Sequence, residues 1–321
     1  MTIDLTRRTL LQLAGASSLA MAAAGAARAE GNPQGGGPTY ASRTPMRIGM
    51  VTLRVKNLDK VADYYRDVIG LAVMERSATA AKLGTAGITL LVLEARPDAA
   101  IEPRNAAGLY HTAFLMPTRK DLARWLVHAA SHRVPLSGFA DHLVSESVYL
   151  DDPEGNGIEV YADRDPSQWQ WSEGSVKMAT DELNIPDLLS LTNTRVSDYA
   201  KAPDGLRVGH MHLRVGNLAQ AQGFYHDAVG LDPTRSRGGA AFLSSGRYHH
   251  HLAMNVWQSE GAGQRDDAMT GLAWFSLVTE KQDILAAQEE RLRKGGARVA
   301  RLADGVEAVD PWGTRVRLLK V

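Results

Sequence analysis

Three residues with chemically useful side chains, His142, Tyr149 and Glu159, stand within one short stretch of the chain. The run Asp152-Pro-Glu-Gly-Asn-Gly lies between the tyrosine and the glutamate. Because Asp, Pro, Asn and Gly favour tight turns, we expect Tyr149 to end one strand and Glu159 to lie in the next. A histidine, a phenol and a carboxylate around one turn are the residue types that a metal-dependent oxygenase needs.

The composition restricts how a metal could be held and which partners are expected. The 321 residues include no cysteine, so disulfides, zinc–cysteine sites and thiol chemistry are excluded and any metal must be bound by His, Asp or Glu. Lys and Arg total 36, as do Asp and Glu, and this zero net charge argues against nucleic acid or an anionic membrane as the main partner. With 44% hydrophobic residues, the chain is globular and long enough for two cores.

The chain after position 45 repeats itself. The segment beginning Arg47-Ile-Gly-Met-Val-Thr-Leu-Arg-Val matches the one beginning Arg207-Val-Gly-His-Met-His-Leu-Arg-Val at an offset of 160 (207 − 47), and the segments that begin at Gly108 and Gly271 also match. Four modules result, at about 46–97, 108–163, 206–258 and 270–321. Each has the pattern of a strand, a helix and a run of short strands, or βαβββ.

Apolar residues at helical spacing predict helices at Asn57–Ile69, where Asn57 can act as the N-cap, at Arg119–Arg133 and at Lys281–Lys294. Residues 164–205 show weak periodicity, so we expect a long crossing segment between the halves. A short helix is expected within it at Asp187–Leu191.

The stretch from His142 to Glu159 resembles the signature of the extradiol, ring-cleaving catechol dioxygenases. The four βαβββ modules resemble the vicinal oxygen chelate superfamily, in which two such modules form a cupped sheet around one metal. The resemblance covers essentially all of residues 46–321 and implies an α+β fold with four modules paired into two cupped sheets. It divides the chain into an N-terminal domain at 46–163, a linker at 164–205 and a C-terminal domain at 206–321.

Equivalent positions in the modules show where metal ligands are available. The first strands carry Met50, His111, His210 and Trp274, and the last strands of modules two and four carry Glu159 and Arg317. Ligand types therefore occur only in modules two and three. Two imidazoles and one carboxylate form the facial triad typical of non-haem Fe(II), which leaves positions open for substrate and O2. Since one complete site requires it, we expect module two to pair with three, and module one with four.

Further residues around the metal have roles that the resemblance implies. The tyrosine at the position of Tyr149 hydrogen-bonds the bound catecholate in extradiol enzymes, and the histidine at the position of His142 stabilises the bound oxygen. His212, two residues after His210 on the same strand face, is an alternative metal ligand.

Three consecutive histidines occupy positions 249–251. The resemblance assigns the acid/base role to His250. Because side chains alternate along a strand, we expect His249 and His251 to face away from His250. A solvent-exposed edge or an adventitious metal site is the alternative interpretation of this run.

The N-terminal residues have the pattern of a targeting segment. Arg7 and Arg8 precede an apolar, alanine-rich run and the small-residue pattern Ala27-Arg28-Ala29, which resembles a twin-arginine signal peptide. Residues 1–29 are therefore expected to direct export to the periplasm and to be removed. An uncleaved membrane anchor is disfavoured because the apolar run is shorter than the roughly 20 residues that a span requires. Residues 30–45 are expected to be a flexible tether.

These features predict an extradiol dioxygenase similar to the two-domain catechol 2,3-dioxygenases of bacteria. The resemblance implies that Fe(II), with Mn(II) as the alternative, binds both oxygens of a catechol so that O2 can open the ring beside the hydroxyls. Two alternatives are a glyoxalase- or epimerase-type metal enzyme, which would need a second Glu ligand, and a protein that binds an aromatic compound without catalysis. The expected partners are a small aromatic diol and O2, with no nucleic acid and no membrane after signal cleavage, and a homo-oligomer stays open.

Overall fold

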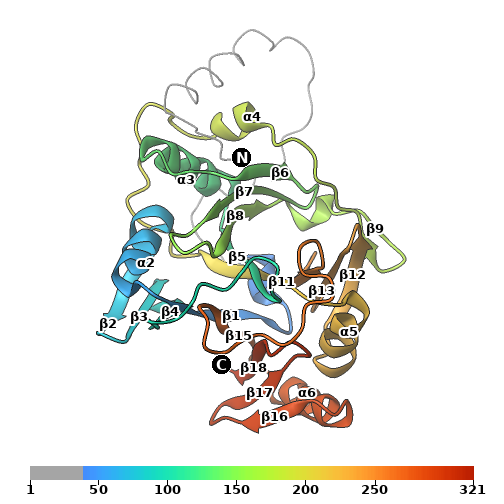
Figure 1. The fold of residues 1–321 in the computed structure, drawn as a ribbon. Helices are drawn as coiled ribbons and strands as arrows, with labels where there is room; N and C mark the ends of the chain where they lie inside the picture. The colour runs from blue at the N-terminus through green and yellow to red at the C-terminus, as the bar shows by residue number, and fades with distance from the viewer. Residues whose placement is uncertain (1–38) are drawn as a thin grey trace.

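The computed structural model describes residues 39–321, and two eight-stranded sheets form its centre (Figure 1). The first sheet contains, in spatial order, β16 (Arg298–Arg301), β17 (Gly305–Val309), β18 (Arg315–Lys320), β15 (Gly271–Thr279), β1 (Arg47–Val55), β4 (Ile88–Ala95), β3 (Ala80–Thr85) and β2 (Ala72–Arg76). The second contains β12 (Asp232–Arg237), β13 (Ala240–Ser244), β14 (Leu252–Asn255), β11 (Arg207–Arg214), β5 (Gly108–Met116), β8 (Gly157–Asp163), β7 (Ser145–Asp151) and β6 (Gly138–Asp141). The predicted α+β fold with two sheets of paired modules is confirmed.

Each sheet combines one module from each half of the chain. Antiparallel pairing of β1 with β15 joins modules one and four, with Thr52 opposite Trp274. Antiparallel pairing of β5 with β11 joins modules two and three, with His111 opposite His212. The pairing predicted from the distribution of ligand residues is therefore the one found. The predicted domains at 46–163 and 206–321 are consecutive parts of the chain. Each sheet, in contrast, contains one module from each of these two parts.

The helices begin close to the predicted positions. Asn57 accepts a hydrogen bond from the Lys60 backbone N–H and begins α2 (Leu58–Tyr64), which continues as the π-helical turn η3 (Tyr65–Ile69). The other long helices are α3 (Arg119–Ser131) and α6 (Gln282–Lys294), while α5 (Leu218–Gln222) and the π-helical turn η5 (Gly223–Ala228) belong to module three. In Figure 1, α3 lies beside strands β6 to β8, and α6 lies beside β16 to β18. Each helix thus covers the strands of its own module.

The crossing segment contains more structure than its periodicity indicates. It includes the 3₁₀ turn η4 (Pro166–Gln168), the short hairpin of β9 (Trp171–Ser172) and β10 (Ser175–Val176), and helix α4 (Ile185–Leu189). Helix α4 begins two residues before the predicted start at Asp187, because Asn184 caps it and Pro186 stands in its first turn. A bridge between Asp141 and Asp181 attaches the segment to the edge of the second sheet.

The expected signal peptide at 1–29 lies outside the described residues, so the twin-arginine prediction stays a prediction. The expected tether at 30–45 is wrong for its last part, since Tyr40–Arg43 form the 3₁₀ turn η2. Thr44 is buried, and its hydroxyl donates to the carbonyls of Ala41 and Met46, which fixes this part of the chain. Within residues 39–321, no helix is long and apolar enough to cross a membrane.

One continuous hydrophobic core extends across both sheets and their helices. Trp125 on α3 is fully buried in this core, and its indole N–H donates to the Val68 carbonyl oxygen at 2.8 Å. This hydrogen bond connects the helix of module two to the turn η3 of module one. Because the two modules belong to different sheets, Trp125 stabilises the arrangement of one sheet against the other.

We expect Trp125→Ala to lower the free energy of unfolding by about 3–5 kcal/mol, because it leaves a large cavity and an unpaired carbonyl oxygen. Chemical denaturation followed by circular dichroism measures this change. Leu191→Ala, at a side chain that is 37% exposed, is the control and should change the free energy of unfolding by less than about 0.5 kcal/mol. Equal effects of the two substitutions would contradict the role of Trp125.

Candidate metal centre and substrate pocket

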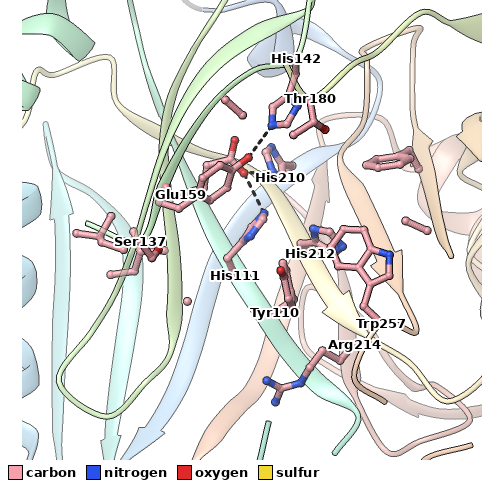
Figure 2. Close-up of a pocket in the computed structure, with 18 of the residues that line it drawn as sticks. Tyr110, His111, Ser137, His142, Glu159, Thr180, His210, His212, Arg214 and Trp257 are labelled. Atoms are coloured by element: carbon pink, nitrogen blue, oxygen red, sulfur yellow. Dashed lines mark hydrogen bonds and ion pairs between the residues drawn. The ribbon is translucent and has the colours of Figure 1, made fainter. Parts of the chain in front are cut away.

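Strand register brings three potential metal ligands to one face of the second sheet. β5 lies between β8 and β11, and Ala113 on β5 stands opposite both Glu159 on β8 and His210 on β11. His111 is two residues before Ala113, so its side chain lies on the same face of β5. Figure 2 shows His111, Glu159 and His210 pointing toward one another in the pocket.

The three ligand atoms are close enough for one metal ion to contact all of them. Glu159 Oε2 lies 2.9 Å from His111 Nε2 and 3.1 Å from His210 Nε2, and all three atoms lie within 4.8 Å of one another. Ligand atoms about 2.1 Å from an ion and at right angles are about 3 Å apart, which matches both distances. All three side chains are buried, and the geometry at His111 Nε2 gives it no hydrogen bond within residues 39–321. The donor set therefore fits a divalent metal.

Electrostatics gives this cluster the protonation state that a metal requires. Burial alone would raise the pKa of Glu159, but its interactions with His210 and with His111 hold it well below its usual range. Burial lowers the pKa of His210 to about 4, against the opposing effect of Glu159. An ionised carboxylate and a neutral imidazole can both coordinate a cation without first losing a proton.

Tyr149 and His142 form a hydrogen-bonded pair beside the cluster. Tyr149 stands opposite Glu159 in the pairing of β7 with β8, and its hydroxyl lies 2.6 Å from His142 Nε2. The other ring nitrogen, His142 Nδ1, lies 2.7 Å from the Ala179 carbonyl oxygen, which can only accept. His142 therefore carries its proton on Nδ1, and Nε2 accepts from the Tyr149 hydroxyl. Burial, and next the charge of Glu159, raise the pKa of Tyr149 well above its ordinary value.

Of the three consecutive histidines, His249 and His251 stay out of the pocket as expected, but strand alternation is not the reason. They precede β14 and lie in the β13–β14 loop, so strand alternation does not apply to them. His250 lines the pocket, and its ring centroid is 4.2 Å from that of His210. His249 instead contacts Asp163, and His251 accepts from the backbone N–H of Ser245. All three are buried, so the alternative of an exposed edge is wrong.

His212 lines the pocket without joining the ligand cluster. Asn255 holds it: the Asn255 side-chain oxygen accepts from the Trp257 backbone N–H, and its amide nitrogen donates to His212 Nε2 at 2.8 Å. The structure thus favours His210 over His212 as the ligand from β11. Because His212 Nε2 is an acceptor, the neutral ring carries its proton on Nδ1.

The cluster lies in a cavity of about 530 Å³. One wall is aromatic, with the Tyr110 ring centroid 5.4 Å from that of Trp257 and 4.6 Å from that of His212. Another wall comes from the crossing segment, which contributes Met178, Ala179 and Thr180. Sequence analysis missed these wall residues, since a carbonyl oxygen or a threonine in an aperiodic segment carries no motif. The cavity can hold a flat ring against aromatic surfaces, next to the three ligands.

The equivalent face of the first sheet has no such cluster among the described residues. Trp274 and Arg317 stand where the second sheet has His111 and Glu159, and the Arg317 guanidinium lies 3.8 Å from the Trp274 ring centroid. Arg317 also donates to Glu307, 2.8 Å away on the neighbouring strand. Glu307 stands opposite Arg317 in the same way that Tyr149 stands opposite Glu159 in the second sheet. A cation–π contact and an ion pair therefore replace the ligands there.

Comparisons with known proteins agree with this architecture. A catechol-2,3-dioxygenase of Bacillus subtilis (strain 168) is 36% identical over 271 residues, which cover 82% of this chain and 93% of that protein. The solved structure of a putative dioxygenase from Bacillus subtilis has a TM-score of 0.57 at 11% identity, covering 85% of this chain and 84% of the other. Glyoxalase I from Zea mays has a TM-score of 0.52 at 14% identity, covering 86% and 92%.

The two structural matches show the fold alone, because proteins with different activities share it. A family model described as the Glyoxalase/Bleomycin resistance protein/Dioxygenase superfamily matches residues 47–160 and 207–316, which are the two halves of the repeat. With this match across both halves and the 36% identical relative, the chain belongs to the Glyoxalase/Bleomycin resistance protein/Dioxygenase superfamily.

Proposed function

We propose that this protein is an extradiol dioxygenase that opens a catechol-type ring with O2 at an Fe(II) ion held by His111, Glu159 and His210. The observation that carries the proposal is the convergence of two imidazoles and one carboxylate on one buried face, within 4.8 Å. This ligand set is the facial triad of non-haem iron oxygenases. The similarity to a catechol-2,3-dioxygenase supports an aromatic diol as the substrate class.

When bound, the metal supplies a cationic centre at which both substrate oxygens and O2 meet. The chain positions the substrate around that centre. The cavity is about 530 Å³ and lined on one side by Tyr110 and Trp257, so an aromatic ring can stack or make edge contacts there. The buried ligands set the position of the diol.

Tyr149 and His142 can take up a proton from the diol. Because His142 Nε2 accepts from the Tyr149 hydroxyl, the Tyr149 oxygen keeps lone pairs for a substrate hydroxyl. When the Tyr149 oxygen accepts a proton from substrate, it can pass its own hydroxyl proton to His142 Nε2, so that Tyr149 stays neutral. The Ala179 carbonyl, which holds His142 Nδ1–H, keeps the ring oriented for this exchange.

His250 approaches the centre from module three, beside His210. Because it lines the pocket next to His210, it is the second group able to exchange a proton with substrate. We assign it the acid/base role during ring opening. The site thus has two separate groups that can transfer protons. This suits a reaction in which a substrate hydroxyl first loses a proton and an oxygen atom derived from O2 gains one in a later step.

We also propose, from the sequence alone, that the twin-arginine pattern at Arg7 and Arg8 directs export to the periplasm. Export of this kind acts on folded chains and would permit the metal to be loaded before translocation. The substrate would then be an aromatic diol met outside the cytoplasm.

Metal binding can be measured without catalysis. We expect His210→Gln to weaken Fe(II) binding more than about 100-fold, because it removes a ligand, whereas loss of an outer-shell partner alone costs 10- to 100-fold. Anaerobic calorimetric titration with Fe(II) gives the dissociation constants. His212→Gln is the matched control, since the same substitution two residues away leaves the cluster intact. If His212→Gln weakened binding more than His210→Gln, His212 would be the ligand.

Catalysis is tested by loading the protein with Fe(II) without oxygen and mixing it with catechol and air. We expect oxygen uptake together with absorbance from a yellow ring-opened semialdehyde. Glu159→Gln should abolish both because it removes the anionic ligand. No oxygen uptake across a panel of catechols, despite bound iron, would favour a protein that binds aromatic compounds without catalysis.

The role of Tyr149 is tested separately with Tyr149→Phe, which keeps the ring and removes the hydroxyl. We expect kcat for catechol to fall by about 10²-fold or more, since a positioned proton-transfer group contributes this much. Steady-state oxygen consumption gives kcat and KM. Tyr199→Phe, which removes a hydroxyl that donates to the Ile69 carbonyl oxygen away from the pocket, should leave kcat within about twofold. Equal effects would reject a specific role for Tyr149.

A further inference from the structure

We propose that Asp163 and His249 are positioning residues that fix the tautomer of His250, so that His250 presents an unprotonated Nε2 to the pocket. The inference rests on the acid/base role of His250 in the proposed function. It assigns a task to two buried side chains that the metal site itself does not use.

Asp163 sets the direction of the hydrogen bonds. Its Oδ1 lies 2.8 Å from His249 Nε2 and 3.1 Å from the Tyr248 hydroxyl. A carboxylate oxygen only accepts, so His249 carries a proton on Nε2 and Tyr248 donates. The Tyr248 oxygen in turn lies 2.8 Å from the Tyr161 hydroxyl, and since the Tyr248 proton is already donated, Tyr161 is the donor. Each contact is thereby oriented toward Asp163.

The orientation continues from His249 to His250. His249 Nδ1 lies 2.8 Å from His250 Nδ1. A neutral His249 with its proton on Nε2 has a lone pair on Nδ1, so the proton between the two rings belongs to His250 Nδ1. That leaves His250 Nε2 with its lone pair, and His250 is the member of the pair that lines the pocket. The result is a base prepared to receive a proton from substrate.

The surroundings of His249 keep this geometry rigid. The His249 side chain is 0% exposed, and its ring packs against those of Trp169 and Tyr248, with centroid distances of 5.2 and 4.0 Å. The Asp163 side chain is 13% exposed, so the hydrogen-bonded series runs from the pocket to a carboxylate that contacts solvent. Packing alone does not require hydrogen bonds at both ring nitrogens of His249. These two contacts are the observation that indicates a positioning task.

The ligand-free sheet provides an internal comparison. Leu91 pairs with Val51 in β1 as Leu252 pairs with Met211 in β11, but only Ala86 and Gly87 stand between β3 and β4, so the first sheet has no counterpart of the loop that carries His249. Thr279 pairs with Lys320 as Met116 pairs with Ala162, so Val321 occupies the position of Asp163. Val321 is apolar and 62% exposed, so it can form no such series. The Asp–His pair accompanies the metal ligands.

Nuclear magnetic resonance of the full chain, labelled with ¹⁵N in its histidines and free of metal, tests the tautomer directly. The nitrogen shifts show which ring nitrogen of a neutral histidine carries the proton, and the spectrum of His250→Gln identifies the His250 signals. We expect His250 protonated on Nδ1 and bare on Nε2. A wild-type His250 protonated on Nε2, or a His249 protonated on both nitrogens, would overturn the proposal.

Asp163→Ala should convert the His250 signals to those of a tautomer mixture, while circular dichroism shows an unchanged fold. Asp165→Ala is the matched control, because the exposed Asp165 side chain bonds to Ser167 instead. If Asp163→Ala does not fold, His249→Phe keeps the test open, since it removes the acceptor of the His250 Nδ1 proton and should also give a tautomer mixture at His250. His250 signals that stay the same in a folded Asp163→Ala variant would reject the role of Asp163.

The iron-loaded protein gives a second readout. Asp163→Ala should lower kcat for catechol by about 10- to 100-fold with KM changed less than about threefold, as for other residues that orient a reacting group. A change confined to KM would contradict a positioning role. If the wild-type protein opens no catechol at all, the proposed function fails. The role of Asp163 and His249 in fixing the tautomer is still tested by the resonance experiment, which does not depend on catalysis.

Discussion

The antiparallel pairing of β5 with β11 is the contact on which the candidate site depends. It places Ala113 opposite His210, while the parallel pairing with β8 places the same alanine opposite Glu159. The small side chain of Ala113 separates the two larger groups across one row of the sheet, and His111 completes the cluster from two residues earlier. A slip of one residue in this register would turn His210 to the opposite face and dismantle the site. The positions of the three ligands are thus set first by the register of the strands and only then by the side chains.

Burial makes that row chemically useful and energetically costly at once. An ionised carboxylate in a site with little solvent access is unfavourable unless charge or hydrogen bonds compensate it. Here two imidazoles supply the compensation, and the low pKa of His210, about 4, shows that burial resists protonation of the ring. A neutral imidazole cannot balance the carboxylate charge fully, whereas a divalent cation can. The cluster is therefore better satisfied with a metal than without one, which agrees with its role as a ligand set.

The sequence predicted those parts of the site that have a position in a repeat or a motif. The offset of 160 aligned Met50 with His210, and the resulting distribution of ligands required the observed pairing of modules. His142, Tyr149 and Glu159 followed from one local stretch whose strands and turn are adjacent in the fold. The wall from the crossing segment could not be predicted in this way, because the Ala179 carbonyl orients His142 through backbone geometry alone. The contact of His249 with Asp163 was also missed, since His249 lies in a loop where no strand period applies.

The ligand-free sheet separates what the fold needs from what the chemistry needs. Both sheets have the same strand order, the same antiparallel pairing at their centre and equivalent buried tyrosines, Tyr65 and Tyr225, which donate to Asp152 and Asp310. Only one sheet has the histidines and the carboxylate, and the other fills that face with Arg317 and Trp274. The two sheets therefore share one strand arrangement although their side chains differ at this face. The His and Glu residues of the second sheet, together with the Asp163–His249 pair behind them, are better explained by a reaction that requires them than by a structure that does.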